Sequence, residues 1–115
     1  MPLSPTKRTL DAIRKQGATC QVVEHWNAFA KRRIDLFGII DIVAIIGSDI
    51  YGIQATSGDN HSHRREKAIA EPKLKLWLEA GGKFLIVSWR KSKPRGHREQ
   101  WTMRQEAIGI LDLCP

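Results

Sequence analysis

Three apolar segments constrain the fold of this chain more than any other feature. Residues 83–89 (KFLIVSW) form an almost continuous apolar run, which is typical of a strand buried on both faces of a sheet. Residues 34–46 (IDLFGIIDIVAII) are too many for one straight strand, and Gly38 predicts a bend or bulge within them. A turn at residues 47–49 (GSD) leads into residues 50–56 (IYGIQAT), so the last two segments predict an antiparallel hairpin.

Helical and strand patterns around these segments complete the expected order of elements. Residues 5–17 predict a helix, and residues 61–80 predict a second helix that Pro72 breaks or kinks. Residues 19–26 (TCQVVEHW) predict one strand, and residues 100–104 (QWTMR) predict an edge strand. The expected fold is therefore α/β, with helices flanking a mixed sheet.

The composition is that of one globular domain over residues 1–115. A hydrophobic content of 42% is sufficient for one core. No apolar run approaches the roughly 20 residues that cross a bilayer, and the chain does not start with a secretory signal. Cys20 and Cys114 lack a zinc-binding spacing, and a disulfide between them is not expected in the reducing cytosol, where we expect the protein to be.

A net charge of +7 favours polyanionic partners. The chain has 19 Lys and Arg residues against 12 Asp and Glu, and each phosphate that a basic chain neutralises releases counterions. The cationic residues form three groups: residues 31–33, residues 61–67 and residues 90–98. The second group lies at an expected helix start, where free N–H groups favour phosphate and Asn60 is a candidate cap. The expected nucleic-acid-binding residues are Arg32, Arg33, Asn60, Arg64, Arg65, Lys91, Lys93 and Arg95.

Four tryptophans raise the question of base stacking. Trp77 and Trp89 lie on predicted packing faces and are expected in the core. Trp26 and Trp101 remain open between packing and stacking.

Asp41 interrupts an apolar segment and predicts a site of chemistry. A buried carboxylate without a partner costs several kcal/mol in practice, so a cation or hydrogen-bond donors should lie nearby. The predicted hairpin can place Gln54 beside Asp41. A carboxylate, an amide oxygen and the Ala55 carbonyl would form an oxygen-rich site suited to Mg²⁺ or Mn²⁺.

The order of IDIVAI, hairpin, YGIQATSG, basic helix and KFLIVSW resembles the PD-(D/E)XK nuclease superfamily over residues 5–105. The likeness is greatest to small phage- and metagenome-type, Holliday-junction-resolvase-like members, in which the (D/E)xK motif is written QxT or QxS. The resemblance implies a restriction-endonuclease-like αβββαβ core, with Asp41 as the motif Asp, Gln54 as the (D/E) residue and Thr56 in place of the Lys. It also implies Mg²⁺- or Mn²⁺-dependent hydrolysis of DNA in a bacterial or phage-infected cell.

Further charged residues are needed to complete such a site. A second acid would help to stabilise the attacking and leaving oxygens, and Glu24 is the first candidate. Asp35 is the second, unless it pairs with the arginines before it, and Asp11 is the acid available in the first helix. Because Thr56 cannot replace an ammonium group, Lys67 at the start of the following helix is the candidate catalytic lysine, unless it is a solvated surface residue.

The residues leave two other functions open. A nucleic-acid-binding protein on a decayed nuclease fold is the first alternative, because Gln54 removes an acid and Thr56 removes the lysine. A structural protein whose basic face binds acidic protein partners is the second. DNA is the expected partner, and a homodimer through residues 100–104 is considered because a four-way junction presents two symmetric cuts.

Overall fold

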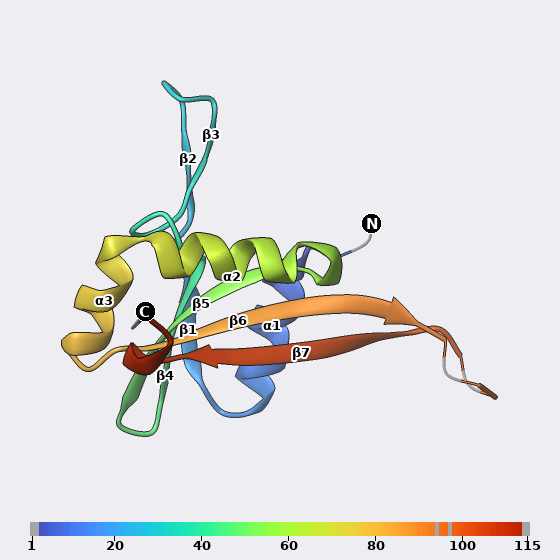
Figure 1. Cartoon of the computed structure of the whole chain (residues 1–115). Coiled ribbons are helices and arrows are strands. Elements are labelled where there is room, and N and C mark those ends of the chain that lie inside the picture. The colour runs from blue at the N-terminus through green and yellow to red at the C-terminus, as the bar shows by residue number, and fades with distance from the viewer. Residues whose placement is uncertain (1–2, 94, 97, 114–115) are drawn as a thin grey trace.

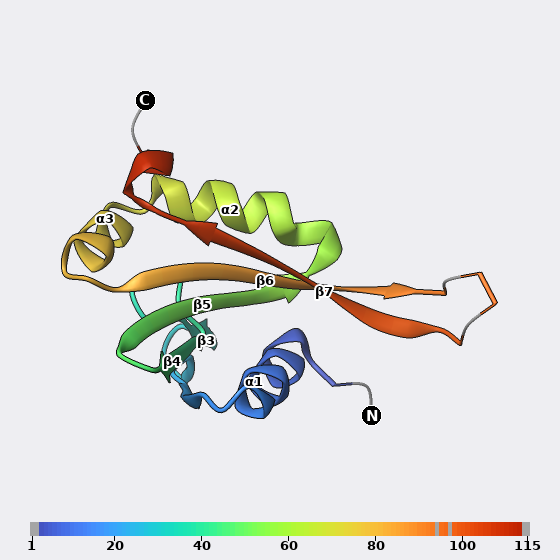
Figure 2. The ribbon, with the colours of Figure 1, turned by 90° about the horizontal axis from the view of Figure 1, so that it is seen from below.

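The apolar segments form a mixed β-sheet with helices on both faces (Figure 1 and Figure 2). The computed structural model describes residues 3–93, 95–96 and 98–113. Within these residues, a sheet of five strands has the order β1-β4-β5-β6-β7, and β2 pairs with β3 in a separate hairpin. The elements are α1 (Pro5–Lys15), β1 (Thr19–Val22), β2 (His25–Asn27), β3 (Arg32–Ile34), β4 (Ile42–Ile46), β5 (Asp49–Ser57), a 3-10 turn (Gly58–Asn60), α2 (His61–Ala70), α3 (Pro72–Glu79), β6 (Lys83–Ser92), β7 (Gln100–Ile108) and a second 3-10 turn (Ile110–Leu113).

The pairing of β5 with β6 gives the sheet its mixed character. β1, β4 and β5 are antiparallel neighbours, β5 and β6 run parallel, and β7 is antiparallel to β6. Parallel neighbours need a crossover, which α2 and α3 provide. The expected α/β class with helices flanking a mixed sheet is confirmed. The edge strand predicted at residues 100–104 is β7, which extends four residues further.

Two apolar cores lie on opposite faces of the sheet. Figure 2 shows α1 on one face and α2 with α3 on the other. The core beside α1 contains Leu10, Ile13, Ile42, Ala44, Ile53 and Val87. The core beside α2 and α3 contains Ile39, Ile40, Ala68, Leu74, Phe84, Ile86 and Ile108.

The period of β5 directs Gln54 toward α2 and α3. Ile42 and Ile53 are paired in register and belong to the core beside α1. Gln54, the neighbour of Ile53 in β5, therefore faces the other side, because successive strand residues alternate between faces. Gln54 also pairs with Ile86, which belongs to the core beside α2 and α3. The site lies at the end of the sheet, between its two faces, because Asp35 lines a cavity with Lys67 of α2 whereas Glu24 lines a cavity with Lys7 of α1.

The single strand predicted at residues 19–26 is wrong. β1 ends at Val22, and the amides of Val23 and Glu24 both donate to the Asp41 carbonyl, at 2.8 and 3.4 Å. The chain then leaves the sheet and forms the β2–β3 hairpin, which projects from the body of the molecule (Figure 1). The first cationic group, residues 31–33, is divided between turn and strand: Lys31 has a φ of 53° in the turn, and the two arginines after it lie in β3.

The sequence predicted that Asp41 lies inside a strand. In the structure Asp41 lies immediately before β4, which starts at Ile42. Between β3 and β4 the chain forms a loop in which Phe37 and Gly38 have φ values of 55° and 77°. The predicted bend at Gly38 is therefore confirmed, but it is a wide loop that separates two strands of different sheets. The Asp41 amide still donates to the Ile53 carbonyl at 2.8 Å, which holds Asp41 against β5.

The helices follow the prediction more closely. α1 starts at Pro5, with the Ser4 hydroxyl accepting from the Lys7 amide, and the break at Pro72 separates α2 from α3. Asn60 stands at the cap position of α2, but its side-chain amide donates to Ser57 at 3.1 Å and does not cap the helix. None of the described helices is both long and apolar enough to cross a membrane. Cys20 is a free thiol, and Cys114 lies outside the described residues.

A candidate metal centre

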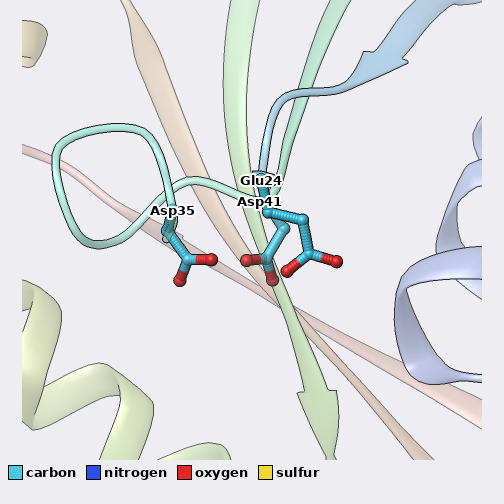
Figure 3. Close-up of side chains that lie close together, drawn as sticks. All are labelled: Glu24, Asp35 and Asp41. Carbon is cyan, nitrogen blue, oxygen red and sulfur yellow. The ribbon is translucent and has the colours of Figure 1, made fainter. Parts of the chain in front are cut away.

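Three carboxyl groups gather at one end of the sheet. One oxygen from each of Glu24, Asp35 and Asp41 lies within 4.8 Å of the others. Figure 3 shows Asp41 between the other two side chains, with the three carboxyl groups close to one another. Asp41 is 3% exposed, and the other two residues are half-buried. The two acids that the sequence offered as alternatives thus lie together beside Asp41.

The β2–β3 hairpin is what unites the cluster. His25 and Ile34 are the pair at its base, so Glu24 and Asp35 are the next residues on each side. Antiparallel strands keep such residues opposite each other. The Glu24 amide also donates to the Asp41 carbonyl, which ties the base of the hairpin to the start of β4. The sheet and the hairpin therefore meet at the three acids.

Burial and mutual repulsion make the ionised cluster costly. Burial is the main cause that raises the pKa of Asp41 from 3.8 to about 8, and the adjoining Asp35 and Glu24 carboxyls raise it further, against the Ala55 N–H. Burial also raises the pKa of Glu24, with Asp35 adding to the effect and Arg33 opposing it. A divalent cation would offset both effects, because it compensates the charge that water no longer solvates.

Two donors fix the orientation of the Asp41 side chain. Gln54 Nε2 and the Ala55 amide donate to the same oxygen, Asp41 Oδ2, at 2.8 and 2.9 Å. The sequence correctly placed Gln54 beside Asp41, but the Gln54 atom that contacts the carboxylate is the amide nitrogen and not the predicted oxygen ligand. Likewise, Ala55 contacts Asp41 through its N–H. In this arrangement both residues position Asp41, and the oxygen-rich set consists of the three carboxylates.

Lys67 lies beside the cluster, but not where the sequence placed it. It is in the last turn of α2 rather than at its start, and its side chain is exposed. It lines a cavity of about 410 Å³ together with Asp35, Arg32 and Arg33. A second cavity of the same size is lined by Glu24, Lys7 and Arg33. The acids are therefore flanked by a basic hollow beside Asp35 and by a second hollow whose cations are paired, Arg33 with Glu24 at 3.7 Å and Lys7 with Asp11 at 3.0 Å.

Some of the other residues predicted to bind nucleic acid are already paired within the protein, and others are exposed. Arg65 is engaged inside the protein, with Nε 2.6 Å from Glu106 and a terminal nitrogen 3.9 Å from Asp112. Its predicted place at a nucleic-acid interface is therefore not favoured. Within the described chain, Arg64 has a buried Nε without a hydrogen-bond partner. Lys91 pairs with Glu99 at 3.5 Å, whereas Asn60, Lys93 and Arg95 are exposed.

A buried polar network at His61 was missed by the sequence reasoning, which grouped this residue with the surface cations. His61 is 1% exposed, with Nδ1 2.6 Å from Ser88 Oγ and Nε2 2.9 Å from Glu106. Burial opposes ionisation of Glu106, but hydrogen bonds from Arg65 and His61 outweigh it and lower the pKa of that carboxyl. The missed signal was Ser88, which is a polar residue in an apolar strand just as Asp41 is in an apolar segment.

Replacing His61 with Ala is expected to lower the free energy of unfolding by about 2–4 kcal/mol, because Ser88 and Glu106 would lose a buried partner. Urea unfolding followed by circular dichroism measures this change. His63→Ala is the matched control, since His63 is an exposed residue of the same helix turn and should change stability little. Equal effects of the two substitutions would contradict a structural role for the network.

Comparison with known proteins does not indicate a function for this chain. No family model, curated protein or solved structure matches this chain. What supports a function is therefore the chemistry of the three acids and of the cations around them.

Proposed function

We propose that this protein is a metal-dependent endonuclease that hydrolyses DNA phosphodiester bonds, with a PD-(D/E)XK type of core. The observation that carries the proposal is the cluster of Glu24, Asp35 and Asp41 beside the basic hollow that Arg32, Arg33 and Lys67 line. The order of α1, three antiparallel strands β1, β4 and β5, the crossover helices and parallel β6 is also the αβββαβ order expected of such a core.

The donor set fits Mg²⁺ or Mn²⁺. Hard divalent cations prefer carboxylate oxygens, and three carboxyls within 4.8 Å offer them without nitrogen or sulfur ligands. Glu24, Asp35 and Asp41 would hold the ion. When bound, such an ion supplies a Lewis acid for the phosphoryl oxygen and lowers the pKa of a bound water.

Residues around the acids would orient the metal ligands and bind the phosphodiester. Gln54 and Ala55 hold one oxygen of Asp41 in place, so the carboxylate is preorganised before an ion binds. Arg32, Arg33 and Lys67 line the cavity beside Asp35 and would attract the DNA backbone. Lys67 would also stabilise the negative charge that develops on the phosphate.

A direct test is to incubate the wild type with branched and linear DNA in Mg²⁺ or Mn²⁺, and again in EDTA. We expect cleavage that requires the ion. Absence of cleavage on every DNA, or cleavage unchanged in Asp41→Ala, would contradict the proposal.

Removing the Lys67 ammonium is expected to lower the single-turnover cleavage rate about 100-fold, because a charge that stabilises the transition state would be lost. Lys67→Ala is the variant, and Lys75→Ala is its control, since Lys75 is 66% exposed on α3 and pairs with Glu79. If Lys67 served only as a DNA contact, its loss would weaken binding and leave the rate at saturating DNA unchanged. That result would contradict the assigned role.

A nucleic-acid-binding protein without catalysis is the second candidate. The observation that favours it is the motif itself: Gln54 presents an amide nitrogen to Asp41, and the position of the usual lysine holds a buried Thr56. Salt-sensitive DNA binding by a wild type that never cleaves would support this candidate against the first.

A further inference from the structure

The β2–β3 hairpin exposes two aromatic side chains to solvent. Phe29 at its turn is 100% exposed, and Trp26 in β2 is 62% exposed. The hairpin stands away from the sheet and the helices, so these rings lie outside both cores (Figure 1). Clustered apolar groups on a surface mark a place where another molecule binds.

The other tryptophans are held by the protein. The Trp77 and Trp89 indoles donate to the Lys83 carbonyl and the Thr9 hydroxyl, each at 2.9 Å. The Arg8 guanidinium lies 4.0 Å from the centre of the Trp101 ring. Trp26 differs because it lies on the projecting hairpin, which favours stacking over packing for this residue.

The hairpin is also strongly basic, and this selects the class of partner. Residues 25–34 contain Lys31, Arg32 and Arg33 and no acidic residue. Trp26 lies directly opposite Arg33 in the register, and Arg33 lines both hollows beside the acids. Aromatic rings beside cations suit nucleic acid, because bases stack on the rings while phosphates bind the charges.

Asn27 orders the backbone of the turn that carries Phe29. Asn27 Oδ1 accepts hydrogen bonds from the amides of Phe29 and Ala30, both at 2.9 Å. Such a bonded turn limits the motion of the tip. At its other end the hairpin begins next to Glu24 and ends next to Asp35, so the hairpin connects the tip directly to the acid cluster.

We propose that the β2–β3 hairpin is a base-stacking wedge that selects nucleic acid with a break in its base stacking, such as a branch point or a bulge. Phe29 would enter the break, and Trp26 with Arg33 would contact the nucleotides between it and the acids. This proposal rests on the proposed nuclease function. Phe29 is five residues beyond Glu24, which places it on the order of 15 Å from the acids along an extended strand. Cleavage is therefore expected about four or five nucleotides from the break.

Binding tests the wedge separately from cleavage. The probe is a forked DNA that carries 2-aminopurine at the branch, whose fluorescence rises when the base is unstacked, in EDTA so that no cleavage occurs. The wild type should raise the fluorescence and bind the fork about tenfold more tightly than the matched duplex. Phe29→Ala should lose both effects, Trp26→Ala should lose part of the preference, and Phe29→Trp should restore it.

Leu76→Ala is the matched control, because Leu76 is an apolar side chain 64% exposed on α3, away from the hairpin. The wedge proposal is overturned if Phe29→Ala keeps the fluorescence change and the preference for the fork, or if the wild type binds fork and duplex equally. If the wild type shows both effects but never cleaves DNA in Mn²⁺, the nuclease proposal fails while the wedge stands. If the wild type cleaves DNA and Phe29→Ala leaves that cleavage unaffected, the wedge fails while the nuclease proposal stands.

Discussion

Asp41→Asn is expected to give a protein that unfolds at a higher temperature than the wild type at about pH 9 in EDTA, but that no longer cleaves DNA. The amide keeps the shape of the carboxyl group, and its oxygen can accept the same hydrogen bonds from Gln54 and Ala55. It carries no charge, and its nitrogen can donate toward Glu24 and Asp35. The substitution therefore removes the repulsion that burial makes costly.

The size of the effect follows from the pKa of Asp41. It lies at about 8 against an ordinary value of 3.8. Each pKa unit corresponds to about 1.4 kcal/mol, so ionising this carboxyl lowers the free energy of unfolding by up to roughly 6 kcal/mol. We expect Asp41→Asn to recover about 2–4 kcal/mol of this at pH 9. Loss of the central metal ligand should at the same time lower the cleavage rate by at least about 1,000-fold.

Thermal and urea unfolding in EDTA measure the first effect, and single-turnover cleavage in Mn²⁺ measures the second. Asp49→Asn is the control, because the Asp49 carboxylate forms an exposed ion pair with Lys83 at 3.2 Å. It should change stability by less than about 1 kcal/mol and leave cleavage unchanged. A less stable Asp41→Asn protein that retains activity would contradict both the electrostatic strain and the catalytic role.

A gain in stability with a loss of function is the mark of a residue kept for chemistry. The sequence indicated this much for Asp41, since a carboxylate in an apolar segment is costly in any fold. It also predicted that Gln54 would lie beside Asp41, because hairpin register follows from the turn. The sequence pattern does not show which atom of the Gln54 amide faces the Asp41 carboxylate, because this depends on local hydrogen bonds. The predicted oxygen ligand therefore did not follow from the pattern.

The assembly of the acid cluster was beyond the sequence pattern. The sequence offers Glu24 as the first and Asp35 as the second candidate for one added acid, and it predicts a single strand over residues 19–26, which leaves no hairpin to bring the two acids together. That strand ends early because the Val23 and Glu24 amides bond to the Asp41 carbonyl, which is a long-range contact. Only the resulting hairpin, closed by His25 and Ile34, places both acids together. Local propensity indicates extended structure on both sides of residues 23–24 and cannot show that the strand breaks there.

The same reasoning explains the residues that were misplaced around the site. His61 and Arg65 belong to a cationic run, and the pattern alone favours a solvated helix face. Their partner Glu106 lies more than 40 residues away in β7, so the network forms only when the edge strand reaches α2. Surface charge in a sequence therefore overstates how many cations are free to bind phosphate.

The acid cluster should bind a divalent ion more tightly as the pH rises. Without an ion, the raised pKa of Asp41 means that its contribution to stability is complete below about pH 3.8 and is lost as the pH rises to about 8. The raised pKa of Glu24 acts in the same direction. Glu106, with a lowered pKa, acts oppositely, and its contribution is lost only as the pH falls below its ordinary value of 4.5. The metal-free protein should therefore become less stable between about pH 5 and pH 8.

An ion that replaces the Asp41 proton reverses this trend. Below about pH 8, each unit of pH should change the apparent affinity for Mn²⁺ about tenfold, because one proton is displaced. Titration calorimetry, with thermal unfolding as a second measurement, should show a large stabilisation by Mn²⁺ at about pH 8.5 and almost none at about pH 5.5. In Asp41→Asn the stabilisation should be absent at both pH values.

The variant also separates the cluster from the histidines, which can bind Mn²⁺ themselves. Ion binding at histidines would persist in Asp41→Asn, whereas binding at the acids should be lost in that variant and should tighten in the wild type up to about pH 8. An affinity that does not depend on pH, or one that survives the loss of Asp41, would show that Glu24, Asp35 and Asp41 do not form the metal site. The pH dependence thus tests the geometry of the cluster without requiring that a DNA substrate be known.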